Sequence, residues 1–451
     1  MECCLTGVSV MPENIEHLEQ PQAREHRYKV GVHSYEEQAP PADDKITGEH
    51  RKHIEPWLTA LAQSEHLSLL IGSGFTHAAA HLCAVKAPDM SLRECATSID
   101  RRIKSYLQKD SSQRPFDREP NFEDQLQATL TLAGGLAIIG RLELANDVQS
   151  AIRASLFEFR KSIVDCEHEL RARFECKGTS QALDYLQSFL LSFASRAGTR
   201  DRLNIFTTNY DRLIEYVSDA AGLRLLDRFV GTLSPIFRST RLGIDIHYNP
   251  PGIRGEPRYL EGVVRFSKLH GSVDWIAEHN AIRKVPLSFG DSDSLRDDGS
   301  DVLIYPNASK DVETSMYPYS DLFRDFSAAV CRPNATLITY GYGFGDSHIN
   351  NVITDMMTLH STHLVVISYD DAGGRVSAFL NDLGKPAQTT VLLGSHFGDL
   401  ETLVKHYLPK PAIDPITMRA AELVRRRTVS SHEHDDDPPE GEPNSEGGEG
   451  L

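Results

Sequence analysis

The chain has 451 residues, of which 40% are hydrophobic and 25% are charged, and its net charge is −17. The acidity is concentrated at the ends, because residues 1–50 carry a net charge of −6 and residues 428–451 carry −8, which leaves −3 for the rest. This composition is that of a globular protein with a large core, and the nearly neutral body argues neither for nor against nucleic-acid binding.

The cysteines, the N-terminal residues and the most apolar stretch of the sequence argue against three classes of protein: those with a zinc ribbon or disulfide framework, those with a signal peptide and those that span a membrane. The seven cysteines are odd in number and contain no C-x-x-C pair, which argues against a zinc ribbon and against a disulfide framework. The N-terminus lacks the basic and apolar regions of a signal peptide. The most apolar stretch, Ala128–Gly140, is shorter than the roughly 18 residues that a membrane span needs. We therefore expect a cytoplasmic protein without a metal site and without a membrane anchor.

The two ends of the chain differ in composition from its middle. Residues 1–48 mix Pro, Glu and Gln without periodicity, which predicts a disordered or loosely docked segment. Residues 409–451 end in a low-complexity acidic stretch, which predicts a disordered tail. Residues 49–408 are expected to form the catalytic domain.

The folded part begins with a predicted helix at Glu55–Ser64 and a predicted strand at Leu67–Ile71, followed by a glycine turn and a second helix from Thr76. Residues 90–200 then show long helical periodicity, clearest at Ala151–Leu170 and Gln181–Ala194. We interpret residues 90–200 as a helical insertion between the first and second strands of a sheet.

After residue 200, predicted strands and helices alternate. The predicted strands are Leu203–Phe206, Val263–Leu269, Val302–Tyr305, Ala335–Tyr340, His363–Ser368 and Thr389–Leu393. The predicted helices are Asp211–Ser218, Ser320–Cys331, Ser347–Leu359, Arg375–Leu383 and Leu400–Tyr407. Such alternation predicts an α/β fold with a Rossmann-like, doubly wound parallel sheet. Residues 222–262 and 277–300 are expected to form loops or a small lobe near the site.

Three of the predicted strands end on residues suited to bind a nucleotide. The turn Gly72-Ser73-Gly74 lies between a strand and a helix, where backbone N–H groups and the helix N-terminus can face a pyrophosphate. Taken alone it is neither G-x-G-x-x-G nor a P-loop, and a simple tight turn explains it equally well.

The second and third strand ends carry the candidate catalytic pair. Asn209 offers an amide donor and a carbonyl acceptor, which suit it to orient a ribose hydroxyl or a water molecule. Asp211 could bind ligand or could simply cap the next helix. His270 ends the following strand and is suited to accept a proton near neutral pH.

A second glycine-rich connection follows the strand at Ala335–Tyr340. Here Gly341, Gly343 and Gly345 alternate before Asp346, which can cap the next helix. Two glycine-rich loops in one sheet suit a dinucleotide better than a mononucleotide.

Taken in order, these segments resemble the sirtuin superfamily, and in particular its NAD-hydrolase branch found in bacterial antiphage defence. The resemblance covers about residues 66–408 and rests on four motifs: Gly72-Ser73-Gly74-Phe75-Thr76, Thr207-Thr208-Asn209-Tyr210-Asp211, His270-Gly271 and Gly341–Ile349. The last has Gly343 where the family's motif has serine. A weaker match is the helix start Asn121-Phe122-Glu123-Asp124, which is similar to that of the branch's helical insertion.

The resemblance implies NAD as the substrate and assigns roles to the matching residues. Asn209 and His270 would be catalytic. The NAD-binding residues would be Gly72, Ser73, Gly74, Phe75, Thr76, Thr207, Asp211, Gly343, Gly345 and Asp346.

Two departures from the family's protein deacylases narrow the expected reaction. The four-cysteine zinc ribbon is missing, because no cysteine lies between Cys176 and Cys331, and Ala78–Cys83 replaces the deacylase motif after the glycine loop. We therefore expect NAD hydrolysis to nicotinamide and ADP-ribose, without zinc. A protein deacylase or ADP-ribosyltransferase and a nucleotide-binding scaffold that recruits a partner are the alternatives. The resemblance also implies a homo-oligomer and a partner in trans such as a HerA-like DNA-translocating ATPase.

Overall fold

The computed structural model describes residues 26–37, 44–93, 100–109, 119–176, 180–196, 200–240, 243–248, 258–278, 281–295, 301–303 and 317–410. The architecture below belongs to one compact unit, Met1–Pro409, and residues 410–451 form a second unit. The predicted acidic tail, apart from residues 409 and 410, lies outside the described residues.

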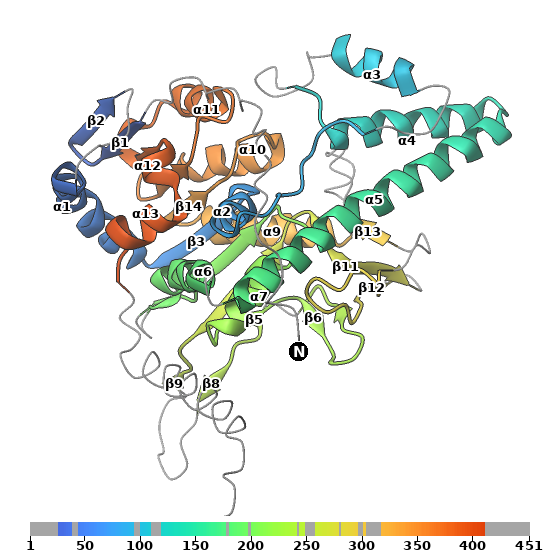
Figure 1. The fold of residues 1–451 in the computed structure, drawn as a ribbon. Helices are drawn as coiled ribbons and strands as arrows, with labels where there is room; N and C mark the ends of the chain where they lie inside the picture. The colour runs from blue at the N-terminus through green and yellow to red at the C-terminus, as the bar shows by residue number, and fades with distance from the viewer. Residues whose placement is uncertain are drawn as a thin grey trace, which may run out of the picture. The chain divides into compact units, whose positions relative to one another are not determined.

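The core of the unit is a large, mostly parallel sheet (Figure 1). Nine strands of the described residues form it in the order β2-β1-β16-β15-β14-β3-β4-β10-β5. The seven strands from β16 to β5 run parallel to their neighbours. Their bounds are β3 His66–Ile71, β4 Asn204–Thr207, β5 Arg224–Leu226, β10 Val263–Lys268, β14 Ala335–Tyr340, β15 His363–Ser368 and β16 Thr389–Leu393.

Helices cover both faces of this sheet, which explains why its central strands are continuous apolar runs. Every residue of β14 is buried, and in β3 and β15 all but the first are. One face packs against α1 (Asp44–Ala62), α2 (Gly74–Cys83), α6 (Ser180–Ala194) and α7 (Leu213–Ala220). The other packs against α9 (Tyr319–Val330), α10 (Ser347–Met356) and α11 (Arg375–Leu383). The predicted Rossmann-like fold is confirmed.

The strand order reverses between β3 and β14. On one side of β3 lie β4, β10 and β5. The chain then returns to the other side of β3 to form β14, β15 and β16. In open α/β sheets, ligands bind at the carboxyl edge where the order reverses. Both predicted glycine-rich loops leave the sheet at this point, one after β3 and the other after β14.

The helical insertion is a long antiparallel hairpin, and it is shorter than expected. It comprises α3 (Asp100–Lys109), α4 (Phe122–Ile138) and α5 (Leu142–Glu175), and α4 and α5 lie side by side in Figure 1. The pair has a core of its own that includes Leu126, Val148 and Ile152. By contrast, α6 packs on the main sheet through Leu186, Phe189 and Phe193, so it belongs to the sheet's helical layer.

A small antiparallel sheet stands beside the main one; three of its strands, β6, β7 and β12, fall within the ranges predicted as loops or a small lobe, and β11 was not predicted. Its described strands run in the order β13-β11-β12-β7-β6. Their bounds are β6 Phe229–Val230, β7 Ile236–Phe237, β11 Gly271–Glu278, β12 Ala281–Lys284 and β13 Asp301–Leu303. The predicted strand at Val302–Tyr305 was assigned to the wrong sheet, because β13 pairs antiparallel with β11. Two further short strands, β8 (His247–Tyr248) and β9 (Arg258–Tyr259), pair with each other.

The prediction of a disordered or loosely docked N-terminal segment is wrong for residues 26–37 and 44–48. Strands β1 (His26–Val30) and β2 (His33–Glu37) extend the main sheet, with β1 antiparallel to β16. Alternate residues of β1 are buried, and Tyr28 packs edge-on against Phe397. The polar residues at every second position of β1 concealed this strand, which lies between β2 and β16. Residues 1–25 lie outside the described part.

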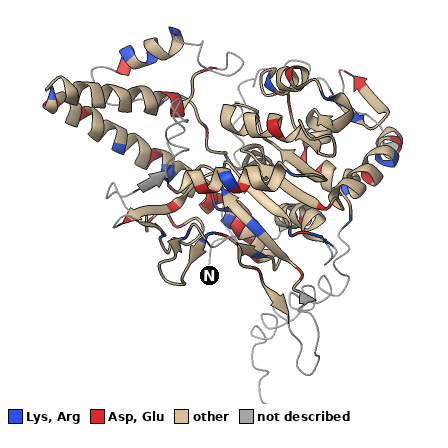
Figure 2. Cartoon of the chain, turned by 180° about the vertical axis from the view of Figure 1, so that it is seen from behind, with Lys and Arg blue, Asp and Glu red and all other residues tan. Residues whose placement is uncertain are grey.

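The end of the unit consists of short helical segments. After η3 (Pro386–Gln388) and β16, these are α12 (Ser395–Gly398), α13 (Leu400–Thr402) and η4 (Leu403–Tyr407, a π-helical turn). The last two occupy the range Leu400–Tyr407, where one helix was predicted. Figure 2 shows segments with Lys or Arg interspersed with segments carrying Asp or Glu over the described elements. No helix of the described part is both long and apolar enough to cross a membrane.

Candidate active site

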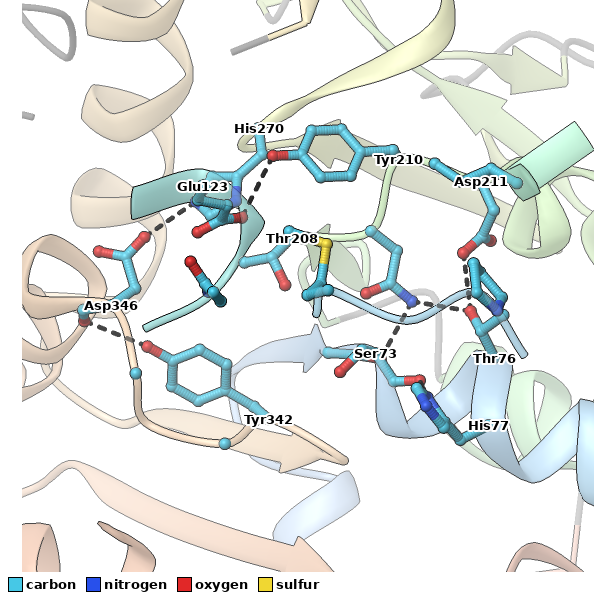
Figure 3. Close-up of a pocket in the computed structure, with 18 of the residues that line it drawn as sticks. Ser73, Thr76, His77, Glu123, Thr208, Tyr210, Asp211, His270, Tyr342 and Asp346 are labelled. Atoms are coloured by element: carbon cyan, nitrogen blue, oxygen red, sulfur yellow. Dashed lines mark hydrogen bonds and ion pairs between the residues drawn. The ribbon is translucent and has the colours of Figure 1, made fainter. Parts of the chain in front are cut away.

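A cavity of about 240 Å³ opens at the carboxyl edge of the main sheet (Figure 3). Loops after β3, β4, β10, β14 and β15 line it together with the insertion. The lining residues are Gly72, Ser73, Thr76, His77, Pro88, Met90, Asn121, Glu123, Phe159, Ile163, Thr208, Asn209, Tyr210, Asp211, His270, Tyr342, Gly343, Gly345, Asp346 and Arg375. The two predicted catalytic residues and most of the predicted binding residues therefore share one cavity.

The two glycine-rich loops pack against each other at the floor of this region. A Cβ atom on Gly72 would lie 2.4 Å from the carbonyl oxygen of Gly341, and one on Gly74 would lie 2.5 Å from the Gly341 Cα. The N–H of Gly72 donates to the carbonyl of Tyr340, and the N–H of Gly74 donates to that of Gly341. The absence of a side chain at Gly72 and Gly74 is thus required for the two loops to approach each other. Gly74 itself is not among the residues that line the cavity.

Asn209 is held by its side-chain amide. Its Nδ2 donates to the carbonyl of Gly72 (3.0 Å) and to the hydroxyl oxygen of Thr76 (3.1 Å). Thr207 is buried outside the cavity, where its hydroxyl donates to the carbonyl of Ile71 and accepts from the Asn209 N–H. Because both hydrogen bonds use Nδ2, the Oδ1 oxygen of Asn209 is left to accept a hydrogen bond from a molecule in the cavity.

Asp211 holds Thr76, one of the two partners of the Asn209 amide. One of its oxygens accepts from the Thr76 hydroxyl at 2.7 Å, and the other accepts from the N–H of Leu213 at 3.1 Å. Asp211 thus lines the cavity and also binds one backbone N–H, that of Leu213 at the start of α7.

His270 is paired with Asp346 across the cavity. Its Nε2 lies 2.9 Å from Oδ2 of Asp346, and both side chains are more than nine-tenths buried. The other oxygen of Asp346 accepts from the N–H groups of His348 and Ile349, which makes Asp346 the N-cap of α10. A carboxylate that accepts from Nε2–H leaves the lone pair on Nδ1, which is the atom able to take a proton.

Phe75 does not have the position that the resemblance implied. Its side chain is fully buried and packs against Phe189 and Tyr340 in the core beneath the sheet. Phe75 therefore points to a different side of α2 from Thr76, which lines the cavity. The side chain of Phe75 anchors the helix and is not among those that line the cavity.

The insertion forms one wall of the cavity. Asn121 caps α4 in a reciprocal capping box with Asp124, and this cap presents Glu123 to the cavity. The hydroxyl of Tyr210 donates to Oε1 of Glu123 at 3.4 Å (Figure 3). Burial, and next the neighbouring Glu123, raise the pKa of Tyr210 well above its usual value of 10, so it remains a hydrogen-bond donor.

Several lining residues were missed from the sequence. Glu123 was quoted only as part of a weak motif, whereas His77 and Tyr342 lie within or beside the glycine loops and were passed over. Arg375 begins α11, and its Nε donates to the carbonyl of Gly343 at 2.8 Å. No sequence pattern connects Arg375 to the loop that it contacts.

Among the described residues, no group of three or more His, Cys, Asp or Glu side chains is arranged to hold a metal ion. The polar groups of the cavity are amides, hydroxyls, the His270–Asp346 pair, the carboxylates of Glu123 and Asp211, the imidazole of His77 and the guanidinium of Arg375. This set is suited to bind and orient an organic ligand.

The fold and the cavity together define an α/β protein with a dinucleotide-type site at the reversal of strand order. Residues 203–385 match the family model described as a SIR2-like domain. The chain therefore carries a sirtuin-like domain, and the resemblance seen in its motifs is confirmed over this range. The assignment supports NAD binding and an NAD-dependent function of the sirtuin type. No curated protein matches the chain.

Proposed function

We propose that the protein is an NAD hydrolase that cleaves NAD to nicotinamide and ADP-ribose. The observation that carries this proposal is the presence of Asn209 and the His270–Asp346 pair in one cavity, beside two interlocked glycine-rich loops. The sirtuin-like domain supplies the substrate class.

The glycosidic bond of NAD needs little acid catalysis, because nicotinamide leaves as a neutral molecule. Cleavage builds positive charge on the ribose, so the protein has to position the ribose and one nucleophile while bulk water is excluded. In our proposal Oδ1 of Asn209 accepts a hydrogen bond from the attacking water. The two bonds from Asn209 Nδ2 fix the direction in which that oxygen points.

His270 completes the reaction by accepting a proton. The water oxygen bonds to the ribose C1′, the electron pair of the breaking C–N bond moves to the nicotinamide ring, and the released proton passes to Nδ1 of His270. Asp346 lies 2.9 Å from Nε2 and stabilises the imidazolium that forms. The reaction then balances without any further reactant.

The proposed binding roles follow the positions of the glycine-rich loops. Ser73 and the N-terminus of α2 would face the pyrophosphate, with Thr76 beside them. Gly343 and Gly345 would shape the opposite wall. Gly74 would contribute by permitting the contact between the loops rather than by touching NAD.

On the strength of the resemblance we extend the proposal to biological role. The protein would deplete NAD as an effector in antiphage defence, as a homo-oligomer and with a partner such as a HerA-like DNA-translocating ATPase. Cells that carry the gene should lose NAD after infection by a restricted phage, and cells with Asn209→Ala should keep it. Light scattering of the purified chain tests the oligomer directly.

The enzymatic proposal is tested by incubating purified protein with NAD, with and without a candidate partner, and separating the products by chromatography. We expect nicotinamide and ADP-ribose from the wild type and neither from Asn209→Ala or His270→Ala. Asn204→Ala is a matched control, because Asn204 stands at the opposite end of β4 and outside the cavity. Turnover that persists in both cavity variants contradicts the mechanism. Nicotinamide release that requires an acylated peptide would identify a deacylase instead.

A further inference from the structure

One charged residue of the cavity has no role in the mechanism above. Arg375 is the only Lys or Arg among the described residues that line the cavity, whereas three carboxylates line it: Glu123, Asp211 and Asp346. A dinucleotide brings two negative phosphates into this surrounding. Positive charge close to the phosphates therefore favours its binding, in addition to the N–H groups at the start of α2.

The loop before α11 directs Arg375 to the glycine loop after β14. Ala372, Gly373 and Gly374 all have positive φ angles, of 50°, 70° and 84°, and this turn ends directly before Arg375. The guanidinium is then fixed by its Nε hydrogen bond to the carbonyl of Gly343. The charge of a guanidinium is shared by all three of its nitrogen atoms, and its planar shape suits it to bind phosphate oxygens.

The same contact explains the departure of this chain from the family's loop motif. The motif has serine where this chain has Gly343. A Cβ atom at Gly343 would lie 3.2 Å from Nη2 of Arg375, so the guanidinium would have to shift by a few tenths of an ångström. The glycine therefore lets the guanidinium lie directly against this loop.

We propose that Arg375 binds the pyrophosphate of the dinucleotide. The position suits this role, because the loop carrying Gly343 directly continues Gly341 and Tyr342, which contact the Gly72 turn at the start of α2. The phosphates would thus lie between the N-terminus of α2 and the guanidinium of Arg375. This inference rests on the proposed function for the identity of the ligand as a dinucleotide, but it does not require that the ligand be cleaved.

The test is the affinity of the full-length protein for ADP-ribose, measured by calorimetry. Arg375→Gln should weaken binding about tenfold or more, and Arg375→Lys should recover part of the loss because it restores the charge without the planar guanidinium. The salt dependence of binding should also become shallower in Arg375→Gln, since a screened charge contact has been removed. Arg332→Gln is the matched control, because Arg332 pairs with Asp201 away from the cavity.

A second variant keeps the test independent of damage to α11. Gly343→Ser leaves the charge in place but displaces the guanidinium, so it should also weaken ADP-ribose binding. The double variant Gly343→Ser/Arg375→Gln should be no worse than Arg375→Gln alone, because the two residues act through one contact. Additive losses would overturn the inference.

The remaining outcomes separate this inference from the proposed function. ADP-ribose binding that is unchanged in Arg375→Gln, or absent in the wild type, overturns the role of Arg375. So does a loss confined to NADP, which would assign the arginine to a 2′-phosphate. If Arg375 governs ADP-ribose affinity in a protein that never cleaves NAD, the inference stands and the hydrolase proposal fails.

Discussion

The two sides of the cavity are built on different physical principles. On the sheet side, the proposed catalytic residue Asn209 is fixed by hydrogen bonds of 3.0 and 3.1 Å to Gly72 and to Thr76 at the start of α2. On the insertion side, Glu123 contacts the sheet side through a hydrogen bond of 3.4 Å from Tyr210. In our proposal the residues at the sheet edge therefore act on the substrate, whereas the insertion contributes a wall of the cavity.

The insertion is nevertheless firmly attached at one point. Glu167 of α5 is buried and accepts from the backbone N–H of Arg212 at 2.7 Å as well as from its guanidinium. Arg212 directly follows Asp211, so this ion pair joins the insertion to the loop that supports Asn209. Four predictions test how far the comparison holds.

The largest effect is expected on the sheet side, for Asp346→Asn. Asparagine can still accept from the N–H groups at the start of α10, but its amide then faces His270 Nε2 as a donor and forces the proton onto Nδ1. We expect kcat for NAD cleavage to fall about a thousandfold, with ADP-ribose affinity nearly unchanged. Asp371→Asn is the control, because Asp371 accepts from the N–H of Ser377 outside the cavity. A kcat near the wild-type value would show that His270 needs no carboxylate partner.

The joint between the two sides is tested by Glu167→Gln. This change leaves the guanidinium of Arg212 buried without its counter-charge, which should lower the free energy of unfolding by about 3 kcal/mol. Urea denaturation measures the loss, and Glu169→Gln, an exposed change two residues along α5, should have almost no effect. Equal stabilities of the two variants would mean that the ion pair does not hold the insertion in place.

The sheet side was also the more predictable one. Its strands are apolar runs that end on Gly, Asn or His, and the parallel order brings those ends together without knowledge of any side-chain contact. Strand β1 was missed because charged residues alternate with its buried ones, and the strands of the small sheet were mostly too short to show periodicity.

Residues that enter the cavity from distant segments could not be found in the same way. Arg375 contacts Gly343 across 32 positions, and only the turn before α11 brings them together. Phe75 belongs to a matching motif, but its side chain lies in the core, because the order of residues in a motif does not show which face of a helix each side chain occupies.

The part of the sheet far from the cavity should respond to acid. His363 at the start of β15 is bound to Thr390 at 2.8 Å and covered by Trp57, and burial lowers its pKa from 6.5 to about 4. Between these values the unfolded chain takes up a proton that the folded chain does not, so stability falls as the pH drops below 6.5.

Between pH 7.5 and pH 5 this single group should cost about 2 kcal/mol of unfolding free energy. His363→Gln keeps an acceptor or donor for Thr390 without the charge, and it should therefore lose less stability than the wild type over this interval. His360→Gln, at an exposed position, should follow the wild type. Identical pH dependence in all three proteins would place the acid sensitivity elsewhere.

The smallest effect is expected for Glu123→Ala on the insertion wall. The change removes an acceptor of the buried Tyr210 hydroxyl, and the loss of so long a hydrogen bond corresponds to about a fivefold fall in kcat/KM. Tyr210→Phe should have a similar effect, and the double variant should be no worse than either, because one contact is removed in each case. Glu143→Gln, at the far end of the hairpin and exposed, serves as the control. A loss in Glu123→Ala as large as that in Asn209→Ala would break the comparison, because the insertion would then supply a group that acts on the substrate itself.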